Sequence, residues 1–159
     1  MVQLPVTAPG GALTHTLVDA GDAKRLAHRS WWLHPDGYAA SDVTCGDAKT
    51  IAYLHREILP PPPGLLVDHI NGDRLDNRRS NLRTATPSQN NANSRDRPRK
   101  SGFRGVYPHR PTGRWIAQVS VAGRPPHLGI FDDPRDAARA YDLAAREQWG
   151  PFARTNGFA

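Results

Sequence analysis

The sequence predicts an α+β protein with more strands than helices. Two observations predict this class. Residues 65–67 and 82–85 are short apolar runs that flank a long polar loop and precede a helix signal. Three further strand-like runs precede a helical stretch at residues 133–149. Strands that come in runs before single helices are typical of α+β folds, whereas alternating strands and helices indicate a parallel sheet.

The N-terminal region, residues 1–54, is expected to consist mostly of strands and turns. A strand at 17–19 leads into a short helix, and a His-Pro-Asp-Gly turn separates two runs that predict a hairpin. A further strand is expected just before the next region. The ranges for the helix, the hairpin strands and the last strand are 22–28, 31–33, 38–40 and 51–54.

The central region begins after a stiff connector, because the consecutive prolines 60–63 favour polyproline II. The strand at 65–67, a polar loop at 68–80 and the strand at 82–85 follow. Thr86 is the expected N-cap of the next helix, with Pro87 in its first turn and Gln89 completing a capping box. This region therefore predicts the order strand, long loop, strand, helix.

The C-terminal region follows a charged, proline-containing linker at 94–101. Three strands and one helix are expected, and the alanine-rich side of the helix would pack closely on the sheet. Asp133 is the expected helix cap and Gly150 the stop signal. The strands are expected at 103–107, 115–121 and 127–131.

Composition excludes a membrane protein and argues against wholesale disorder, since 38% of the 159 residues are hydrophobic and 23% are charged. The net charge is +6, all of it beyond residue 54, which suits a nucleic-acid binder but equally a merely basic surface. Cys45 is the one cysteine, so no intramolecular disulfide and no structural zinc are expected. With no secretory signal in this sequence, we expect a cytoplasmic protein.

Four polar residues around the central loop form a candidate catalytic site. Asp68 supplies a carboxylate, a hard oxygen ligand, and its neighbour His69 an imidazole that can take a proton from water. The strand-loop-strand order could return Asn81 beside His69, and Asn90 could supply a second oxygen ligand. Taken singly, each residue is more often a turn or solvated residue. It is the joint spacing that favours a functional site.

These residues lie in three segments, LVDHINGD at 66–73, DNRRSNLRTAT at 76–86 and QNNAN at 89–93, which closely resemble the HNH endonuclease family, in particular phage homing-type enzymes. The resemblance implies a ββα-metal nuclease core. By this resemblance His69 is the general base, Asn81 orients it, and Asp68 and Asn90 bind Mg²⁺ or Mn²⁺. The oxygen donors disfavour tight zinc binding.

Several basic residues near this segment are candidate contacts with substrate. His55 and Arg56 follow Leu54 in a unit that is common in the same family, and are candidates for active-site support. Their alternative is a purely structural role at the end of a strand. A solvated loop face explains the remaining arginines nearly as well as phosphate contact does. These are Arg74, Arg78, Arg79 and Arg83.

The C-terminal segments SGFRGVY, GRWIAQ, LGIF and DAARAYDLAA resemble the plant ethylene-response-factor DNA-binding domain. The resemblance implies a three-stranded antiparallel sheet on one helix, with the sheet entering the major groove. Arg104 matches the leading base-contacting arginine of that family. The expected core is Phe103, Val106, Ile116, Val119, Leu128, Phe131 and Tyr141. The expected DNA contacts are Arg104, Tyr107, His109, Arg110, Arg114, Trp115, Gln118, Ser120, Arg124 and His127.

The sequence as a whole predicts a divalent-metal-dependent endonuclease acting on double-stranded DNA in a phage or bacterial host cytoplasm, with no membrane contact and no nucleotide cofactor. The expected parts are an N-terminal region at 1–54, a nuclease core at 55–95, a basic linker at 96–102 and the DNA-binding module at 103–159. A non-catalytic DNA-binding regulator, an RNA binder and a packaging-associated nuclease stay open as alternatives. The target site, nicking or double-strand cleavage, the oligomeric state and protein partners are left open.

Overall fold

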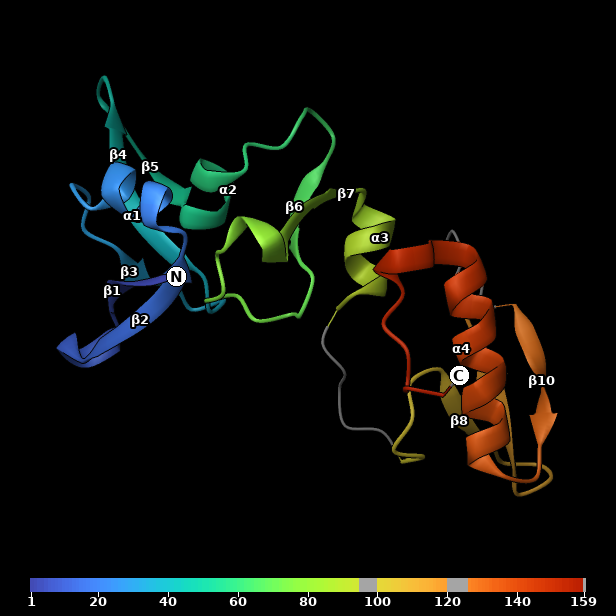
Figure 1. The fold of residues 1–159 in the computed structure, drawn as a ribbon. Helices are drawn as coiled ribbons and strands as arrows, with labels where there is room; N and C mark the ends of the chain where they lie inside the picture. Colours follow the sequence, from blue (N-terminus) through green and yellow to red (C-terminus); the bar gives the residue numbers. More distant parts are fainter. Residues whose placement is uncertain (95–99, 120–125, 159) are drawn as a thin grey trace. The chain divides into compact units, whose positions relative to one another are not determined.

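The computed structural model describes residues 1–94, 100–119 and 126–158. The chain forms two compact units, Met1–Pro87 and Ser88–Ala159 (Figure 1). Both units combine small sheets, in which all described strand pairs but the parallel pair of Val2–Thr7 with Trp32–Leu33 are antiparallel, with few helices, which confirms the α+β class. In the described part of the chain, none of the helices is both long and apolar enough to span a membrane.

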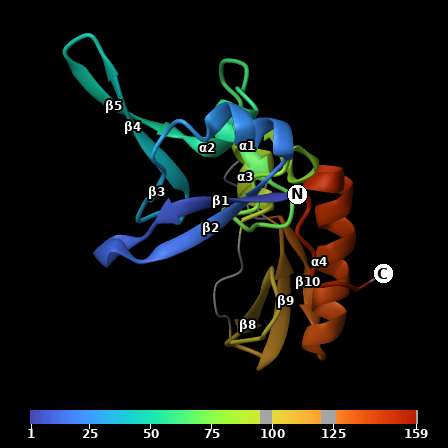
Figure 2. The same cartoon turned by 60° about the vertical axis from the view of Figure 1, so that its left-hand side comes forward.

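The first unit contains a five-stranded sheet in the order β2-β1-β3-β4-β5, and β4 and β5 form a long hairpin that extends beyond the other strands (Figure 2). The hairpin predicted around the His-Pro-Asp-Gly turn is present, with Trp32 opposite Ala40. The strands are β1 (Val2–Thr7), β2 (Leu13–Val18), β3 (Trp32–Leu33), β4 (Ala39–Cys45) and β5 (Ala48–Tyr53); η1 (Pro9–Gly11) joins the first two.

Two short helices cover this sheet. They are α1 (Ala20–Leu26) and α2 (Leu54–Ile58). The core of the unit joins side chains from both helices and from the sheet with Val67 and Leu82 of the central region, so residues 1–54 and the central region share one apolar interior. Its buried members include Val6, Val18, Leu26, Trp31, Leu54, Ile58, Val67 and Leu82.

The central ribbon consists of β6 (Leu66–His69) and β7 (Leu82–Ala85), antiparallel, with Asp68 opposite Arg83 and His69 opposite Leu82. The short 3-10 helix η2 (Arg79–Asn81) ends the loop between them, and α3 (Pro87–Ala92) follows. The predicted order of strand, loop, strand and helix is therefore confirmed, and the helix begins at Pro87 as expected.

The second unit has a three-stranded antiparallel sheet, in the order β10-β9-β8, covered by α4. Gly105 precedes β8 with φ +72°, and a Cβ there would lie 1.9 Å from Cδ2 of Tyr141, so only glycine lets the helix approach this closely. Asp133 caps α4 by accepting from the N–H of Arg135. The elements are β8 (Val106–His109), β9 (Arg114–Gln118), β10 (His127–Phe131), α4 (Pro134–Trp149) and η3 (Gly150–Phe152).

Four local expectations were wrong. A strand at β1 was not expected, and the helix predicted at 22–28 begins two residues earlier, at Ala20. Residues 103–105 precede β8 rather than belonging to it, and Leu54 begins α2 instead of ending a strand. Ser120 and Val121 lie outside the described residues, so the predicted end of the second strand of the module does too.

Candidate active site

His69 lies at the end of β6 with a buried side chain, and its imidazole Nε2 lies 3.1 Å from Oδ1 of Asn77. Asn77 comes from the loop between β6 and β7 and is itself buried. Its Nδ2 donates to Oγ1 of Thr16 on β2 at 2.7 Å and to the carbonyl of Arg74 at 3.3 Å. One carboxamide thus connects the imidazole to the N-terminal sheet.

Aromatic and imidazole rings pack against His69. The ring centroid of His55 lies 5.3 Å from that of His69 in an edge-to-face arrangement, and Tyr38 lies 5.8 Å away. His55 also packs on Tyr38 at 4.7 Å. These contacts restrict rotation of the His69 ring, because a bulky neighbour lies on more than one side of it.

Burial governs the charge of both imidazoles. It lowers the pKa of His55 to about 3, helped by the charge that His69 carries when it is protonated and by the charge of Arg56, so His55 is neutral at neutral pH. Burial also lowers the pKa of His69, while the hydrogen bond with Asn77 and the Asp68 carboxylate oppose that shift. His69 is therefore a neutral imidazole that can accept a proton.

Asn81 was expected to orient His69, but its side chain bonds to other residues of the loop. Its Oδ1 accepts from the N–H of Asn71, and its Nδ2 donates to Oδ1 of Asn71 and to the carbonyl of Asp76, all within 3.0 Å. The carboxamide that contacts His69 belongs to Asn77 instead. The physical reason is that Asn81 ends η2 facing the inside of the loop, where it closes the turn by bonding three backbone and side-chain groups.

His55 and Arg56 lie on α2 rather than at a strand end. His55 reaches the His69 ring, whereas the guanidinium of Arg56 lies over the Tyr53 ring at 5.3 Å from its centroid. Arg56 is exposed on the surface. The structure thus brings one of the two predicted support residues next to the imidazole.

The four loop arginines predicted as phosphate contacts each interact within the first unit. Arg83 donates to Oδ2 of the buried Asp68 from both Nε and Nη2 at 2.8 Å. The guanidinium of Arg74 packs over the Tyr38 ring and donates to the carbonyl of Asp36.

Arg78 and Arg79 form bidentate ion pairs with Asp76 and Asp22, at 2.6 to 2.9 Å. These guanidinium groups hold the pKa of Asp22 and of Asp76 below the usual range. The ion pairs fix the loop on α1 and on itself, which is a structural role that leaves less positive charge for a phosphate.

The two predicted metal ligands fall in different units. Asp68 lies on β6, and Asn90 lies on α3 in the part that belongs to the second unit. Among the described residues, no group of three or more His, Cys, Asp and Glu side chains could hold a metal. The predicted pair, one carboxylate with one carboxamide, is a different donor set.

Arg104 interacts within the second unit. Its Nε donates to the hydroxyl of Tyr141 at 2.9 Å, and its terminal nitrogens donate to the carbonyls of Ala92 and Ser94 at 3.0 and 2.8 Å. The group therefore binds the chain at the C-terminal end of α3, where carbonyls lack helical partners. Arg104, predicted to contact a base, thus connects the end of α3 to Tyr141 on α4.

The sheet of the second unit has one face on α4 and one face outside it. On β9, Ala117 is buried and Trp115 packs with it against the helix, so Trp115 was wrongly expected on the outer face. The residue opposite Ile116 is the exposed Tyr107. By strand alternation, the outer face carries Tyr107, His109, Arg114, Ile116, Gln118 and His127. Ile116 was therefore wrongly expected in the core, because it alternates with Trp115 and Ala117, which face the helix.

Arg110 lies off this face, exposed in the turn after β8. Arg124 lies outside the described residues, as does Ser120. Arg114 itself pairs with Asp132 through an exposed ion pair at 2.7 Å, which is weak in water and available to exchange for a phosphate.

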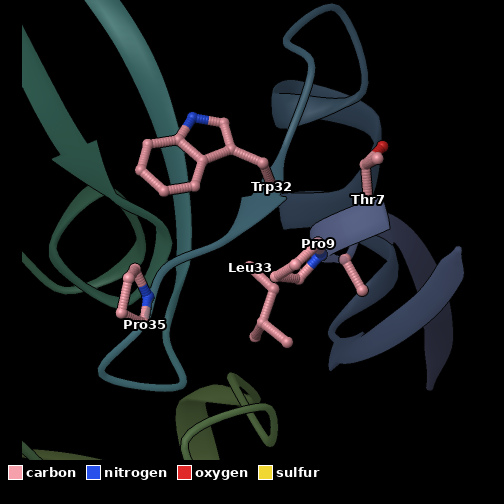
Figure 3. A pocket seen from close by; sticks show the side chains of 6 residues that line it. Thr7, Pro9, Trp32, Leu33 and Pro35 are labelled. Atoms are coloured by element: carbon pink, nitrogen blue, oxygen red, sulfur yellow. The ribbon is translucent and has the colours of Figure 1, made fainter. Parts of the chain in front are cut away.

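The N-terminal sheet also carries an apolar pocket, which shares no residue with the His69 site (Figure 3). The residues that line it are Thr7, Ala8, Pro9, Trp32, Leu33 and Pro35. No acid, base or thiol is among them, so the pocket offers no group for acid-base or nucleophilic chemistry.

An imidazole beside a carboxylate at the end of a two-stranded ribbon, followed by a helix, defines the class of this protein as a His-containing ββα fold. The HNH endonuclease family model matches residues 60–92, and this segment belongs to that family. An uncharacterized HNH endonuclease of Acanthamoeba polyphaga mimivirus is 31% identical over 128 residues, which cover 79% of this chain and 66% of the viral protein.

The C-terminal part is similar to plant transcription factors. The AP2-like ethylene-responsive transcription factor ANT of Arabidopsis thaliana is 46% identical over 68 residues, covering 36% of this chain and 12% of the plant protein. The ethylene-responsive transcription factor ERF084 of the same plant is 51% identical over 65 residues, covering 39% and 25%. The chain thus joins an HNH segment to an AP2-like segment, and it spans only a part of each relative.

Proposed function

We propose that the protein is a divalent-metal-dependent endonuclease that hydrolyses phosphodiester bonds in double-stranded DNA, with His69 as the general base. One observation carries the proposal: in a segment of the HNH family, a neutral, buried His69 is held by Asn77 beside Asp68. The AP2-like segment supports DNA as the substrate, because its plant relatives are named transcription factors.

His69 takes a proton from a water molecule, whose oxygen then attacks the phosphorus in line with the leaving group. The bond between phosphorus and the 3′ oxygen breaks, which leaves a 5′-phosphate and a 3′-hydroxyl. General-base catalysis of this kind contributes about 10²–10⁴-fold to the rate. His55 and Tyr38 keep the imidazole ring in place during the transfer.

Asp68 and Asn90 are the proposed holders of Mg²⁺ or Mn²⁺. Their donor chemistry fits, because carboxylate and carboxamide oxygens suit hard cations, and Asp68 is a buried carboxylate. The ion would stabilise the negative charge that develops on the phosphate and the 3′ oxygen. Arg83, which binds Oδ2 of Asp68, holds that carboxylate in one orientation.

The outer face of the second unit's sheet is the proposed DNA-binding surface. Tyr107 and Arg114 are exposed on it, and a major groove about 12 Å wide admits a two-stranded β-ribbon. We assign contact with the bases to residues of this face and not to Arg104, because Arg104 donates to Tyr141 and to backbone carbonyls.

The test is incubation of supercoiled and linear DNA with the full chain in Mg²⁺, Mn²⁺ or a chelator. Wild type should cleave only with metal. His69→Ala should bind DNA normally and lose cleavage, while His28→Ala, at an exposed histidine, should cleave at the wild-type rate. Asp68→Ala should lose activity together with its metal dependence.

A nicking rate equal to wild type in His69→Ala removes the general-base role. DNA binding without cleavage by wild type favours the alternative, a non-catalytic DNA-binding regulator with a degenerate nuclease core. Preference for RNA over duplex DNA in a competition experiment favours an RNA-binding protein instead.

A further inference from the structure

The N-terminal sheet contributes to the site through one chain of hydrogen bonds. Oγ1 of Thr16 donates to the carbonyl of Leu75 at 2.6 Å, and Nδ2 of Asn77 donates to Oγ1 of Thr16 at 2.7 Å. Oδ1 of Asn77 then lies 3.1 Å from Nε2 of His69. Thr16 and Asn77 are at most 1% exposed, so water does not compete for these bonds.

The direction of each bond follows from the chemistry of its ends. The carbonyl of Arg74 can only accept, so the atom of Asn77 that faces it at 3.3 Å must be the NH₂ group. The other carboxamide atom, Oδ1, can only accept, so the partner nitrogen Nε2 of His69 must carry a hydrogen. A neutral imidazole with its hydrogen on Nε2 has its lone pair on Nδ1.

The backbone holds Asn77 in this position. The N–H of Leu17 donates to the carbonyl of Leu75, and the N–H of Asn77 donates to the carbonyl of Leu17, both at 2.8 Å. Leu17 and Asp76 thereby form a parallel bridge between β2 and the loop. The loop is thus fixed on a strand that lies more than fifty residues away in the chain.

We propose that Asn77 and Thr16 are positioning residues that hold His69 in the Nε2–H tautomer and so make Nδ1 the nitrogen that accepts the proton from water. The inference rests on the proposed nuclease function. It assigns to the N-terminal region a part in the chemistry, since Thr16 is the nearer of the two groups that accept from the NH₂ group of Asn77, at 2.7 Å against 3.3 Å for the Arg74 carbonyl. Without that hydroxyl only the longer bond to the Arg74 carbonyl opposes a turn of the carboxamide, which would present its NH₂ group to the imidazole.

Thr16→Val is the decisive substitution, because valine has nearly the shape of threonine but no hydroxyl. The single-turnover cleavage rate at saturating DNA should fall about 10–100-fold, as is typical when the support of a catalytic group is lost. DNA affinity should stay unchanged. Thr16→Ser should restore the rate, and Thr14→Val, the same change on the same strand face, should behave as wild type.

The tautomer is read directly by ¹⁵N NMR of the His69 imidazole in the full chain, and this readout does not depend on cleavage. Wild type and Thr16→Ser should show a pyrrole-type Nε2 and a pyridine-type Nδ1. Thr16→Val should show a mixture of the two tautomers.

A wild-type protein with its hydrogen on Nδ1 overturns the inference even if Thr16→Val does not fold. Wild-type cleavage by a folded Thr16→Val also overturns it. If wild type does not cleave DNA but carries the hydrogen on Nε2, and Thr16→Val shows the mixture, the proposed function fails while the assigned hydrogen-bond chain stands.

Discussion

The buried His55 makes the stability of the first unit depend on pH. Burial holds its pKa at about 3 in the folded protein, against 6.5 in an unfolded chain. Between these values the unfolded chain binds the extra proton, so stability is full above pH 6.5 and falls as the pH is lowered. At pH 5 the expected loss is about 2 kcal/mol, because each pKa unit is worth about 1.4 kcal/mol.

His55→Phe should remove this loss while keeping a ring between Tyr38 and His69. The assay is urea denaturation from pH 7.5 to pH 4.5, with hydrogen exchange read by mass spectrometry on peptides from residues 1–87. Working above pH 4.5 avoids the range in which Asp22 and Asp76, whose pKa values are held low, begin to lose their ion pairs.

The free energy of unfolding of wild type should fall by about 2 kcal/mol more than that of His55→Phe when the pH is lowered from 7.5 to 5. His28→Phe, the same substitution at an exposed histidine, should keep the wild-type pH dependence. His69 contributes with the same sign, because burial lowers its pKa too, so some dependence stays in the variant. Equal pH slopes in wild type and His55→Phe would refute the reasoning.

Two further outcomes concern the second unit. Gly105→Ala should destabilise it by about 1–3 kcal/mol more than Gly113→Ala in thermal unfolding, because both glycines have positive φ but only Gly105 faces Tyr141; equal losses would contradict the close approach. Arg114→Ala should reduce the slope of log affinity against log salt by about 1 in DNA binding. Arg139→Ala, on the helix, should leave it unchanged, and an unaltered slope for Arg114→Ala would argue against phosphate contact.

The central ribbon could be predicted from the sequence because its signals are local. A polar loop lies between two apolar runs, and Pro87 marks the start of the next helix. The partner of His69 could not be found in this way. Asn77 and Asn81 are both asparagines in one loop, and the choice between them depends on Thr16, sixty-one residues from Asn77 in the sequence. Only tertiary structure brings such partners together.

Strand β1 was missed for a related reason. Pro5 lies in its middle, and a proline within a run argues against a strand because it has no N–H to donate. The structure tolerates it since β3 pairs with β1 only at Thr7 and Trp32, which leaves Pro5 paired on one side alone, with β2. Trp115 shows the opposite error: alternation gives two faces, but the sequence does not say which face the helix covers.

Net charge alone overstates the basic surface of the first unit. Arg78, Arg79 and Arg83 were candidate phosphate contacts, yet each guanidinium binds a carboxylate that is at most 7% exposed. Their partners are buried, so releasing an arginine to DNA would take an ion pair from a carboxylate with little access to water, which is costly. Arg78 and Arg79 therefore hold the loop that carries Asn77, and Arg83 joins β7 to β6. Under the proposed function, we expect attraction to a DNA backbone from exposed cations such as Arg114, whose carboxylate partner Asp132 remains in water.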